Sequence, residues 1–459
     1  MAAGGGTGLT YAETLQALEA RGRFGIRLGL GRVRALLREI GDPQLGVRGA
    51  LVAGTNGKGS VIALAGSALR AAGYRVGETP KPHLISYRER IVVDGHPIAP
   101  DAFAELAASV IPAADRVARR LGPPTEFELL TAMMFRHFAA ASLDVALVEV
   151  GLGGRLDATH AWDGGVAVVT NVDLDHTDRL GTTVEAIARE KAAIIVRGDR
   201  AVTGAVEPAL AIVRRRSRRL GVPLVEAPPA ELLGWDRDRL RVRLPGLGET
   251  EVGLRGRHQA ANVAVADALL DALESAGIAT VPPGARRSGY ATARWPGRLE
   301  LLDIADASGA PREVLLDGAH NPAGAAALAV ALDDLRPYLK SGGTPASPAP
   351  LTIIWASMAD KDVDGTIEAL AASRALEGAT ILCTAIDTPR ALDAESLAAA
   401  WRHGRGDVRI VTAPGPATAF AMALEPGRGP VVVAGSLYLV GAARAALVDD
   451  PALRDPVAG

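Results

Sequence analysis

The residues best suited to chemistry form a glycine-rich loop near the start of the chain, Gly54-Thr55-Asn56-Gly57-Lys58-Gly59-Ser60. An apolar run at 49–53 precedes this loop, and a helical pattern over 61–72 follows it. Glycines let backbone N–H groups turn toward phosphate oxygens, and a helix N-terminus adds a favourable dipole. We therefore predict a triphosphate-binding loop in which Lys58 reaches the β/γ-phosphates and Ser60 ligates Mg²⁺. The alternative is a glycine-rich turn before a helix, since the spacing departs from the ordinary P-loop pattern.

Two polar side chains follow apolar runs that we expect to be neighbouring strands. Glu149 closes the run at 145–149, and His176 comes just after the run at 166–172. Because parallel strands end at one edge of a sheet, both side chains can face the phosphate loop. A carboxylate and an imidazole can hold a cation there, so Ser60, Glu149 and His176 are the candidate metal ligands. Taken singly, Glu149 could equally be a capping or salt-bridged carboxylate, and His176 a hydrogen-bonded loop histidine.

Lysine is scarce in this chain, which indicates where a compact or titratable amine is needed. Only five of the 50 basic residues are lysine, and arginine supplies the rest, a bias that reflects codon usage more than chemistry. Arginine cannot replace lysine where an amine must lose its proton. The lysines are Lys58, Lys81, Lys191, Lys340 and Lys361.

The composition limits the classes of protein to which this chain can belong. The chain has 459 residues, 48% hydrophobic and 22% charged, which predicts two or three globular domains. The net charge of −2 gives no overall attraction to nucleic acid or membrane. The single cysteine, Cys383, excludes an intrachain disulfide framework. Glycine and arginine interrupt the apolar stretch at 430–448, and the first ten residues lack a signal-peptide pattern. We expect a cytoplasmic protein that binds neither nucleic acid nor membrane.

Strand and helix patterns alternate along most of the chain, which predicts an α/β fold with mostly parallel sheets. Helical patterns cover 101–120 and 126–141, between the strands of a P-loop mononucleotide-binding domain. Residues 224–253 alternate in polarity and predict a small antiparallel sheet appended to this domain, followed by a helix over 259–276 and a linker over 281–297. We place the boundary between domains 1–295 and 296–459, the second smaller and Rossmann-like. Its expected strands lie at 314–316, 351–355, 380–383, 408–411 and 431–434, with a flexible surface loop at 341–350.

A set of motifs, in order from about residue 20 to about residue 445, resembles the folylpolyglutamate synthase/dihydrofolate synthase family of the Mur ligase superfamily. Several motifs in register are far more specific than one glycine loop. Besides that loop they are Pro82-His83-Leu84, Glu89-Arg90-Ile91, Glu149 to Thr159, Asp173 to His176, Glu190-Lys191, Gly256 to Asn262, Trp295 to Glu300, Asp317 to Pro322 and Asp360 to Asp362.

The resemblance implies an ATP-dependent ligase that adds L-glutamate to dihydropteroate, to folyl-glutamates or to both, through an acyl phosphate. It implies ATP and Mg²⁺ as cofactors, leaves room for a monovalent cation, and implies a monomer. One alternative is a Mur-type ligase for another carboxylate, although the loop at residue 54 leaves little room before it for a UDP-binding domain. Another is an ATP-binding regulator without ligase activity. A P-loop GTPase would need an Asn-Lys-x-Asp motif, which none of the lysines provides.

The resemblance also implies roles for single residues. It gives Lys58, Lys191, Asp317 and His320 catalytic roles, with Lys191 carbamylated so that it serves as a carboxylate-like metal ligand. It assigns contacts with ATP to Asn262, Arg298 and Asp317 as well as to the loop residues from Gly54 to Ser60. The residues implied to bind the folate-type substrate are His83, Arg90, Phe127, Arg155 and Asp157.

Each implied role has a structural alternative. Lys191 could be a solvated helix lysine, and Asp317 with His320 could cap a strand end. Phe127 is as well suited to a core as to stacking on a pterin ring. The chain also departs from the family at Lys81, where a serine able to ligate metal is usual, and more mildly at Ala323, where a histidine is common. The charge of Lys81 could replace part of a cation's work, or its side chain could project away.

Overall fold

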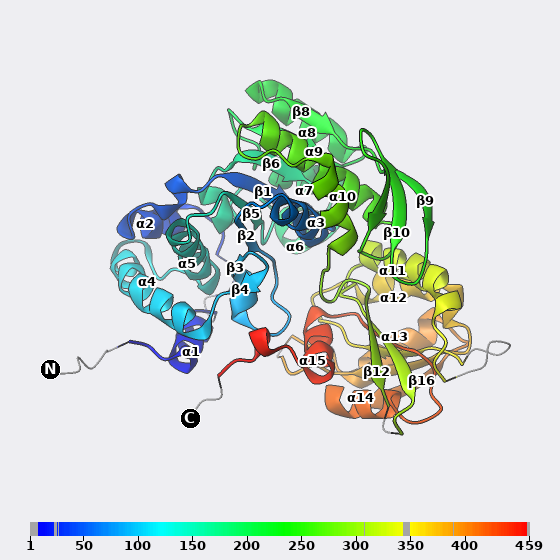
Figure 1. Ribbon diagram of the computed structural model, residues 1–459. Helices are drawn as coiled ribbons and strands as arrows, with labels where there is room; N and C mark the ends of the chain where they lie inside the picture. The colour runs from blue at the N-terminus through cyan, green and yellow to red at the C-terminus, as the bar shows by residue number, and fades with distance from the viewer. Residues whose placement is uncertain are drawn as a thin grey trace. The chain divides into compact units, whose positions relative to one another are not determined.

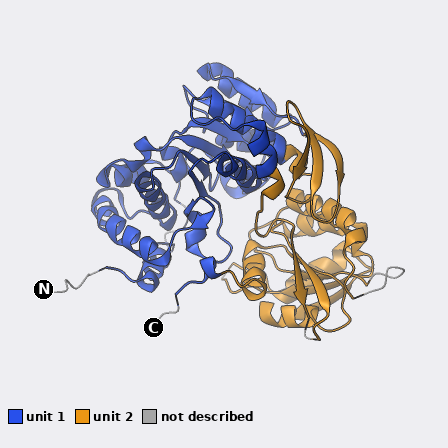
Figure 2. Cartoon of the chain, viewed as in Figure 1, with its two compact units in different colours: residues 1–229, 262–289, 451–459 blue, residues 230–261, 290–450 orange. Residues whose placement is uncertain are grey.

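The computed structural model describes residues 8–22, 25, 27–306, 308–342, 349–388 and 390–456. Contacts divide the chain into two compact units (Figure 2). Unit 1 holds residues 1–229, 262–289 and 451–459, and unit 2 holds residues 230–261 and 290–450. The predicted domain boundary at 295/296 stays a prediction. It lies close to the step from unit 1 to unit 2 at 289/290.

Unit 1 is built on one eight-stranded sheet with the strand order β4-β3-β2-β5-β1-β6-β7-β8 (Figure 1). All neighbours pair in parallel except β3, which runs antiparallel to both β2 and β4. The central strands β1 and β5 are buried along their whole length, as expected of a parallel sheet that helices cover on both faces. The bounds are β1 Gly49–Ala53, β2 Val76–Thr79, β3 Val92–Val93, β4 His96–Pro97, β5 Val145–Glu149, β6 Gly165–Val169, β7 Arg200–Thr203 and β8 Leu224–Glu226.

The helices of unit 1 bury apolar faces against this sheet and against each other. Helices α4 and α5 lie side by side and pack on α1 and α2 (Figure 1). Their core includes Phe103 and Phe135, and the ring of Phe135 lies 5.5 Å from that of Trp162. The bounds are α1 Tyr11–Gly22, α2 Gly31–Glu39, α3 Lys58–Ala71, α4 Pro100–Leu121, α5 Glu126–Ala140, α6 Thr177–Leu180, α7 Val184–Ala192, α8 Ala209–Leu220, α9 Gln259–Ser275 and α10 Pro283–Thr292.

The predicted small antiparallel sheet exists and has the order β11-β10-β9. Its strands are β9 Glu231–Trp235, β10 Leu240–Leu244 and β11 Gly248–Val252. Contacts group it with unit 2, and its assignment to the first domain stays a prediction. The reason lies in its side chains: the Arg257 guanidinium stacks 4.2 Å from the Trp235 ring centroid and pairs with Asp334 at 2.6 Å.

The main sheet of unit 2 has six strands in the order β12-β13-β17-β14-β15-β16, parallel except for β12. Its core includes Trp355 and Trp401, whose rings meet edge to face at 5.6 Å. The strands are β12 Glu300–Ala305, β13 Pro311–Leu316, β14 Thr352–Trp355, β15 Thr380–Thr384, β16 Arg409–Ala413 and β17 Val431–Ala434. The helices are α11 Pro322–Leu335, α12 Val363–Ala371, α13 Ala394–Gly404, α14 Pro416–Ala423 and α15 Leu437–Leu447.

The structure confirms the predicted α/β fold and corrects two elements. Residues 224–226 form β8 of the large sheet rather than part of the small one. The predicted linker contains helix α10, which Pro283 begins at a position where a missing N–H costs nothing. Gly289 lets this helix approach α3, since a Cβ there would lie 2.3 Å from Ala68 Cα. Most of the loop expected at 341–350 lies outside the described residues.

The apolar stretch at 430–448 forms β17, a turn and α15, as predicted. Among the residues that the structure describes, no helix has the length and apolarity to cross a bilayer.

Candidate active site

The phosphate loop leaves the sheet at its centre. Strand β1 lies between β5 and β6, with Val52 beside Glu149 and Ala53 beside Val169. Gly54, the next residue, therefore stands where three parallel strands end together. This edge is where ligands bind in open α/β sheets. The register confirms that Glu149 ends its strand next to the loop.

Two glycines of the loop cannot carry a side chain. Gly54 has φ +156°, and a Cβ on it would lie 1.9 Å from Thr170 Oγ1. Gly57 has φ +79°, and a Cβ on it would lie 2.3 Å from Asn262 Oδ1. Gly57 also precedes the first residue of α3, so the loop ends at a helix N-terminus. The structure thus brings Asn262, a predicted ATP contact, against the middle of the loop.

The strand end of β6 fixes the shape of the loop by hydrogen bonds. The backbone N–H of Asn56 donates to Asn171 Oδ1 at 2.8 Å, and Thr170 Oγ1 donates to the Asn56 carbonyl at 2.7 Å. Thr55 exchanges a second pair of bonds with the backbone of Asp173, at 3.1 and 3.0 Å. Residues 170–173, which lead to His176, therefore hold the phosphate loop in this shape.

Two lysines from different elements converge on one carbonyl of the loop. Lys58 Nζ donates to the carbonyls of Gly54 at 3.1 Å and Thr55 at 2.9 Å. Lys191 Nζ, from α7, donates to the same Gly54 carbonyl at 2.8 Å. Burial first, and the charge of Lys58 second, lower the pKa of Lys191 to about 7. Much of the Lys191 side chain is therefore present as the neutral amine near neutral pH.

Lys81, the residue that departs from the family pattern, contacts Glu149 at two points. Its backbone N–H donates to Glu149 Oε2 at 2.9 Å, and its Nζ donates to the Glu149 carbonyl at 2.6 Å. The other carboxylate oxygen, Oε1, lies 3.9 Å from Lys58 Nζ. Burial lowers the pKa of Lys81 to about 8, opposed by the negative charges of Asp157 and Glu149. The side chain points into the site.

The three candidate metal ligands differ in their exposure to solvent. Ser60 and Glu149 are buried, whereas the His176 side chain is 40% exposed at the start of α6. His176 has φ +50° and its Nε2 lies 3.9 Å from Asp175 Oδ2. Within the described part of the chain, no group of three His, Cys, Asp or Glu side chains is placed to hold a metal ion. The oxygens of Ser60 and Glu149 suit Mg²⁺ by chemistry.

His83 and Arg90, two predicted substrate contacts, lie together. Arg90 Nε donates to His83 Nδ1 at 2.8 Å, and the ring centroids of His83 and Tyr87 lie 4.4 Å apart with their planes tilted by 44°. Burial first, and the Arg90 charge second, lower the pKa of His83 to about 3. The His83 imidazole is therefore uncharged near neutral pH.

Phe127 packs as its core alternative expects, whereas its stacking on a pterin ring stays a prediction. It packs against the hydrophobic core of unit 1, and its ring lies 4.5 Å below Lys81 Nζ. Its ring also packs against the glycine-rich loop after β5, since a Cβ on Gly151 would lie 2.8 Å from Phe127 Cζ. Its place beside Lys81 puts it at the same strand edge as Glu149. A direct contact with substrate stays a prediction.

Asp157 and Arg155 are held by other parts of the protein. The buried Asp157 carboxylate accepts the backbone N–H groups of Gly151, Leu152 and Thr159, at 2.8 to 3.1 Å. Asp157 thereby fixes the loop that follows Glu149. Arg155 is exposed, and its Nε donates to Glu190 Oε1 at 2.9 Å.

In unit 2 the predicted residues gather at the end of β13. The buried Asp317 carboxylate accepts the backbone N–H groups of Leu299 and Ala319, both at 2.9 Å. Burial raises its pKa, and the charge of Arg298 opposes that shift. His320 Nδ1 lies 2.7 Å from the Gly318 carbonyl. Asp317, His320 and Arg298 thus belong to one cluster.

Two polar residues near these groups, His258 and Asn171, were not among the predicted site residues. His258 lies in unit 2, and burial together with the Arg298 charge lowers its pKa to about 4. Asn171 anchors the phosphate loop. A signal existed for both, since His258 lies within the family motif that ends at Asn262, and Asn171 lies two residues after the end of the buried strand β6.

Comparison with known proteins agrees with this arrangement. The family model described as Mur ligase middle domain matches residues 52–270, and that described as Mur ligase, glutamate ligase domain matches residues 297–437. The dihydrofolate synthase/folylpolyglutamate synthase of Mycobacterium tuberculosis is 35% identical over 463 residues, which cover 92% of this chain and 90% of that protein. The folylpolyglutamate synthase of Lacticaseibacillus casei is 33% identical over 450 residues, 96% of this chain and 99% of that protein.

A solved structure is similar over the whole chain. The M. tuberculosis folylpolyglutamate synthase complexed with ADP and AMPPCP superposes with a TM-score of 0.81 at 33% identity, covering 96% of this chain and 100% of that chain. The two matching domain models, the similarity in sequence over more than 90% of the chain and the common fold all indicate one family. The chain belongs to the folylpolyglutamate synthase/dihydrofolate synthase family of Mur ligases.

Proposed function

We propose that this protein is an ATP-dependent ligase that attaches L-glutamate to the carboxylate of dihydropteroate and of folyl-glutamates. The observation that carries the proposal is the convergence of Lys58 and Lys191 on the Gly54 carbonyl. A loop that only binds ATP requires Lys58 alone. The resemblance to the family gives the second, buried lysine at the loop a catalytic role. Membership of the family supports the same activity.

The reaction begins with activation of the substrate carboxylate. A carboxylate does not condense with an amine in neutral water, because oxide would have to leave. Transfer of the γ-phosphoryl group from ATP makes an acyl phosphate, which the amine of L-glutamate attacks as inorganic phosphate departs. Phosphoryl transfer depends mainly on alignment and charge neutralisation. Lys58 and the loop N–H groups provide both for the phosphates, and Asn262 lies against the loop at Gly57.

Bound Mg²⁺ would neutralise phosphate charge, and Ser60, Glu149 and His176 are the residues that would hold it. We further propose that the Lys191 amine adds to CO₂: its nitrogen forms the new N–C bond and its proton passes to solvent. The carbamate is then a carboxylate-like oxygen ligand on α7. A monovalent cation beside these anionic groups is part of the same proposal, as is a monomeric state.

The unit 2 cluster would act on the acyl group and the incoming amine. Arg298 would stabilise the negative charge of ATP and of the acyl phosphate. Asp317, fixed by two backbone N–H groups, would orient the incoming ammonium. His320 would accept the proton that the amine loses when it attacks the carbonyl.

The substrate end would lie along the loop that carries His83 and Arg90. A neutral His83, in tilted contact with Tyr87, offers a flat face to a pterin ring, and Arg90 offers charge to a carboxylate. Phe127 would contribute a second aromatic surface. We propose that one site accepts both dihydropteroate and folyl-glutamates, because the reacting carboxylate and amine are chemically alike in the two reactions.

The test is acceptor-dependent release of ADP in the presence of L-glutamate. We expect release with dihydropteroate and with tetrahydrofolate, each lost in Lys58→Ala and kept in Lys340→Ala, since Lys340 is an exposed lysine of unit 2. Release with tetrahydrofolate alone would overturn the dual activity. Release with neither acceptor would overturn the ligase, and release with an unrelated carboxylate would favour another Mur-type substrate.

A further inference from the structure

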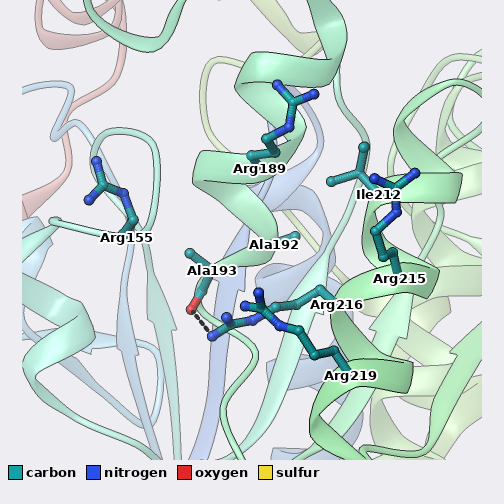
Figure 3. A pocket seen from close by; sticks show the side chains of 8 residues that line it. All are labelled: Arg155, Arg189, Ala192, Ala193, Ile212, Arg215, Arg216 and Arg219. Carbon is teal, nitrogen blue, oxygen red and sulfur yellow. Dashed lines mark hydrogen bonds between the residues drawn. The ribbon is translucent and has the colours of Figure 1, made fainter.

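A pocket of about 320 Å³ lies between α7, α8 and the loop that follows β5 (Figure 3). This volume is within the range of small-molecule sites, about 300–1,000 Å³. Arginines and a few small apolar side chains line it: Arg155, Arg189, Ala192, Ala193, Ile212, Arg215, Arg216 and Arg219. We call it the arginine pocket. It brings five arginines and three apolar side chains together in a chain whose net charge is −2.

Most of the positive charge in the arginine pocket has no carboxylate partner. Arg155 pairs with Glu190, and Arg216 donates to the backbone carbonyls of Ala193 and Ile195. Figure 3 shows the bond from Arg216 to Ala193 at the base of the pocket. The remaining three, Arg189, Arg215 and Arg219, form no ion pair with any residue that the structure describes.

Helix α8 itself supplies a contrast. Arg214, which does not line the pocket, is paired with both Glu207 and Glu226 at 3.0 and 2.6 Å. The next residue, Arg215, faces the pocket without such a partner. The pKa of Arg216 is lowered by burial and then by the charge of Arg219. Guanidinium groups held together in this way repel one another, and an anion between them would remove the repulsion.

We propose that the arginine pocket binds a chain of carboxylates, the γ-linked oligoglutamate tail of a folate that already carries several glutamates. This rests on the proposed function. Each round of ligation leaves one more free α-carboxylate, so the product becomes a regular polyanion. Guanidinium forks bind carboxylates in pairs of hydrogen bonds. The methylene groups between the carboxylates would pack on Ala192, Ala193 and Ile212.

The arginine pocket shares its elements with the phosphate loop. Arg155 lies in the loop that Asp157 fixes, and its backbone N–H donates to the Glu190 carbonyl at 3.0 Å. The neighbouring Lys191 contacts Gly54 from the same helix that places Ala192 in the pocket. A tail held there is bound to the unit that carries ATP. The pocket would therefore favour long-tailed folates over short ones.

The first experiment measures binding without turnover. Tetra-γ-glutamate and inorganic tripolyphosphate are each titrated into the full-length protein and into the triple variant Arg189→Ala/Arg215→Ala/Arg219→Ala. We expect tetra-γ-glutamate to bind the wild type and to bind the variant about tenfold or more weakly, as three charge-assisted contacts are lost. The matched control is Arg218→Ala, an exposed arginine of α8 that does not line the pocket.

The second experiment measures turnover. In the triple variant, KM for a tetraglutamyl folate should rise about tenfold, by the same loss of contacts, while KM for the monoglutamyl folate and for ATP is unchanged. Equal binding of tetra-γ-glutamate by wild type and triple variant, with no change in KM, would overturn the proposal. Binding of tripolyphosphate but not of tetra-γ-glutamate would also overturn it, in favour of a phosphate site. If the wild type showed no ligase activity, only the proposed function would be contradicted. The pocket proposal would still be tested, because the binding titration needs no turnover.

Discussion

Gly318 and Arg298 are so close that the glycine leaves room for the guanidinium. A Cβ on Gly318 would lie 2.0 Å from Arg298 Nη1 and 2.3 Å from Leu437 Cδ2. Arg298 Nη1 also donates to the Gly297 carbonyl at 3.1 Å, and the Gly318 N–H donates to the same carbonyl at 2.9 Å. The backbone between β13 and α11 thus fixes the position of this charge beside Asp317.

Gly318→Ala should therefore displace Arg298 without unfolding unit 2. The added methyl group cannot share its space with the guanidinium, and a flexible side chain moves more readily than backbone. We expect kcat/KM for glutamate addition to fall by on the order of 100-fold, a typical loss when one charge-stabilising donor is removed. Arg298→Ala should give a similar loss. The assay is steady-state ADP release together with the thermal midpoint.

The matched control is Gly406→Ala, since nothing lies within 4 Å of a Cβ at that glycine of unit 2. Gly406→Ala should keep full activity. If Gly318→Ala were as active as wild type with an unchanged thermal midpoint, the position of Arg298 would not matter for catalysis.

Lys191→Ala should abolish turnover while ATP binding is retained. The pKa of Lys191 is about 7, so the amine becomes protonated as the pH falls below 7 and can no longer add to CO₂. We expect wild-type activity to fall with the pH through this range, to fall on removal of dissolved CO₂, and to recover with bicarbonate. The loss in Lys191→Ala should be on the order of 100-fold or more.

The direct measurement for Lys191 is a carbamate carbon signal in ¹³CO₂-labelled protein, present in the wild type and absent from Lys191→Ala. Lys340→Ala serves as the lysine control. Activity that ignores CO₂, with no carbamate signal, would contradict the modification. Full activity of Lys191→Ala would remove Lys191 from the mechanism altogether.

The sheet, the loop and their meeting point could be predicted from the sequence because burial and periodicity are local signals. The runs ending at Ala53 and Glu149 are continuous and apolar, and the glycines that follow are required by steric contact. Helix α10 was missed because prolines and glycines, read locally, indicate a linker. Only the packing of Gly289 on Ala68 shows why a glycine is tolerated there.

The site could be predicted less completely, since partners distant in sequence decide the state of a side chain. Only the bond from Lys81 Nζ to the Glu149 carbonyl shows that this side chain turns toward Glu149, and its role beside a phosphate stays a prediction. The sequence gives no sign that Asp157 is occupied by three backbone N–H groups or that His83 accepts from Arg90. Such contacts depend on the register of strands and loops, which periodicity does not set.

Lys81 should make the stability of the protein depend on pH in alkaline solution. Burial lowers its pKa from 10.5 to about 8, so between these values the unfolded chain binds a proton that the folded chain does not. Stability from this group therefore rises as the pH increases from 8 to 10.5, and it is lost as the pH falls back through 8. Lys81→Met removes the group and should flatten that part of the curve.

The measurement for Lys81 is the difference in thermal midpoint between wild type and Lys81→Met across that pH range. Other titrating groups are common to both proteins, so the difference isolates Lys81. The exposed Lys340→Met provides the comparison with no expected change. A constant difference from pH 8 to 10.5 would show that the folded protein does not lower the pKa of Lys81.

The segment before the C-terminus is attached to the loop that carries His83 and Arg90. Asp455 Oδ1 accepts hydrogen bonds from Tyr11 at 2.9 Å, from Ser86 at 2.7 Å and from Arg88 Nε at 3.1 Å. The Arg88 side chain is only 3% exposed, and Asp455 supplies a carboxylate to this buried guanidinium. Asp455 thereby holds a turn of the chain from which the proposed substrate contacts project.

Asp455→Asn should therefore destabilise unit 1 and weaken acceptor binding. Leaving a buried charged donor without its carboxylate costs about 1–3 kcal/mol. We expect a lower midpoint for the transition of unit 1 in urea, and a higher KM for the folate acceptor while KM for ATP stays constant. Asp178→Asn is the control, because Asp178 is 70% exposed and its pair with Arg179 is a surface pair of little energy. A rise in both KM values together would mean that Asp455 supports the whole unit rather than the acceptor loop. An unchanged midpoint would mean that Arg88 finds another partner when the carboxylate is removed.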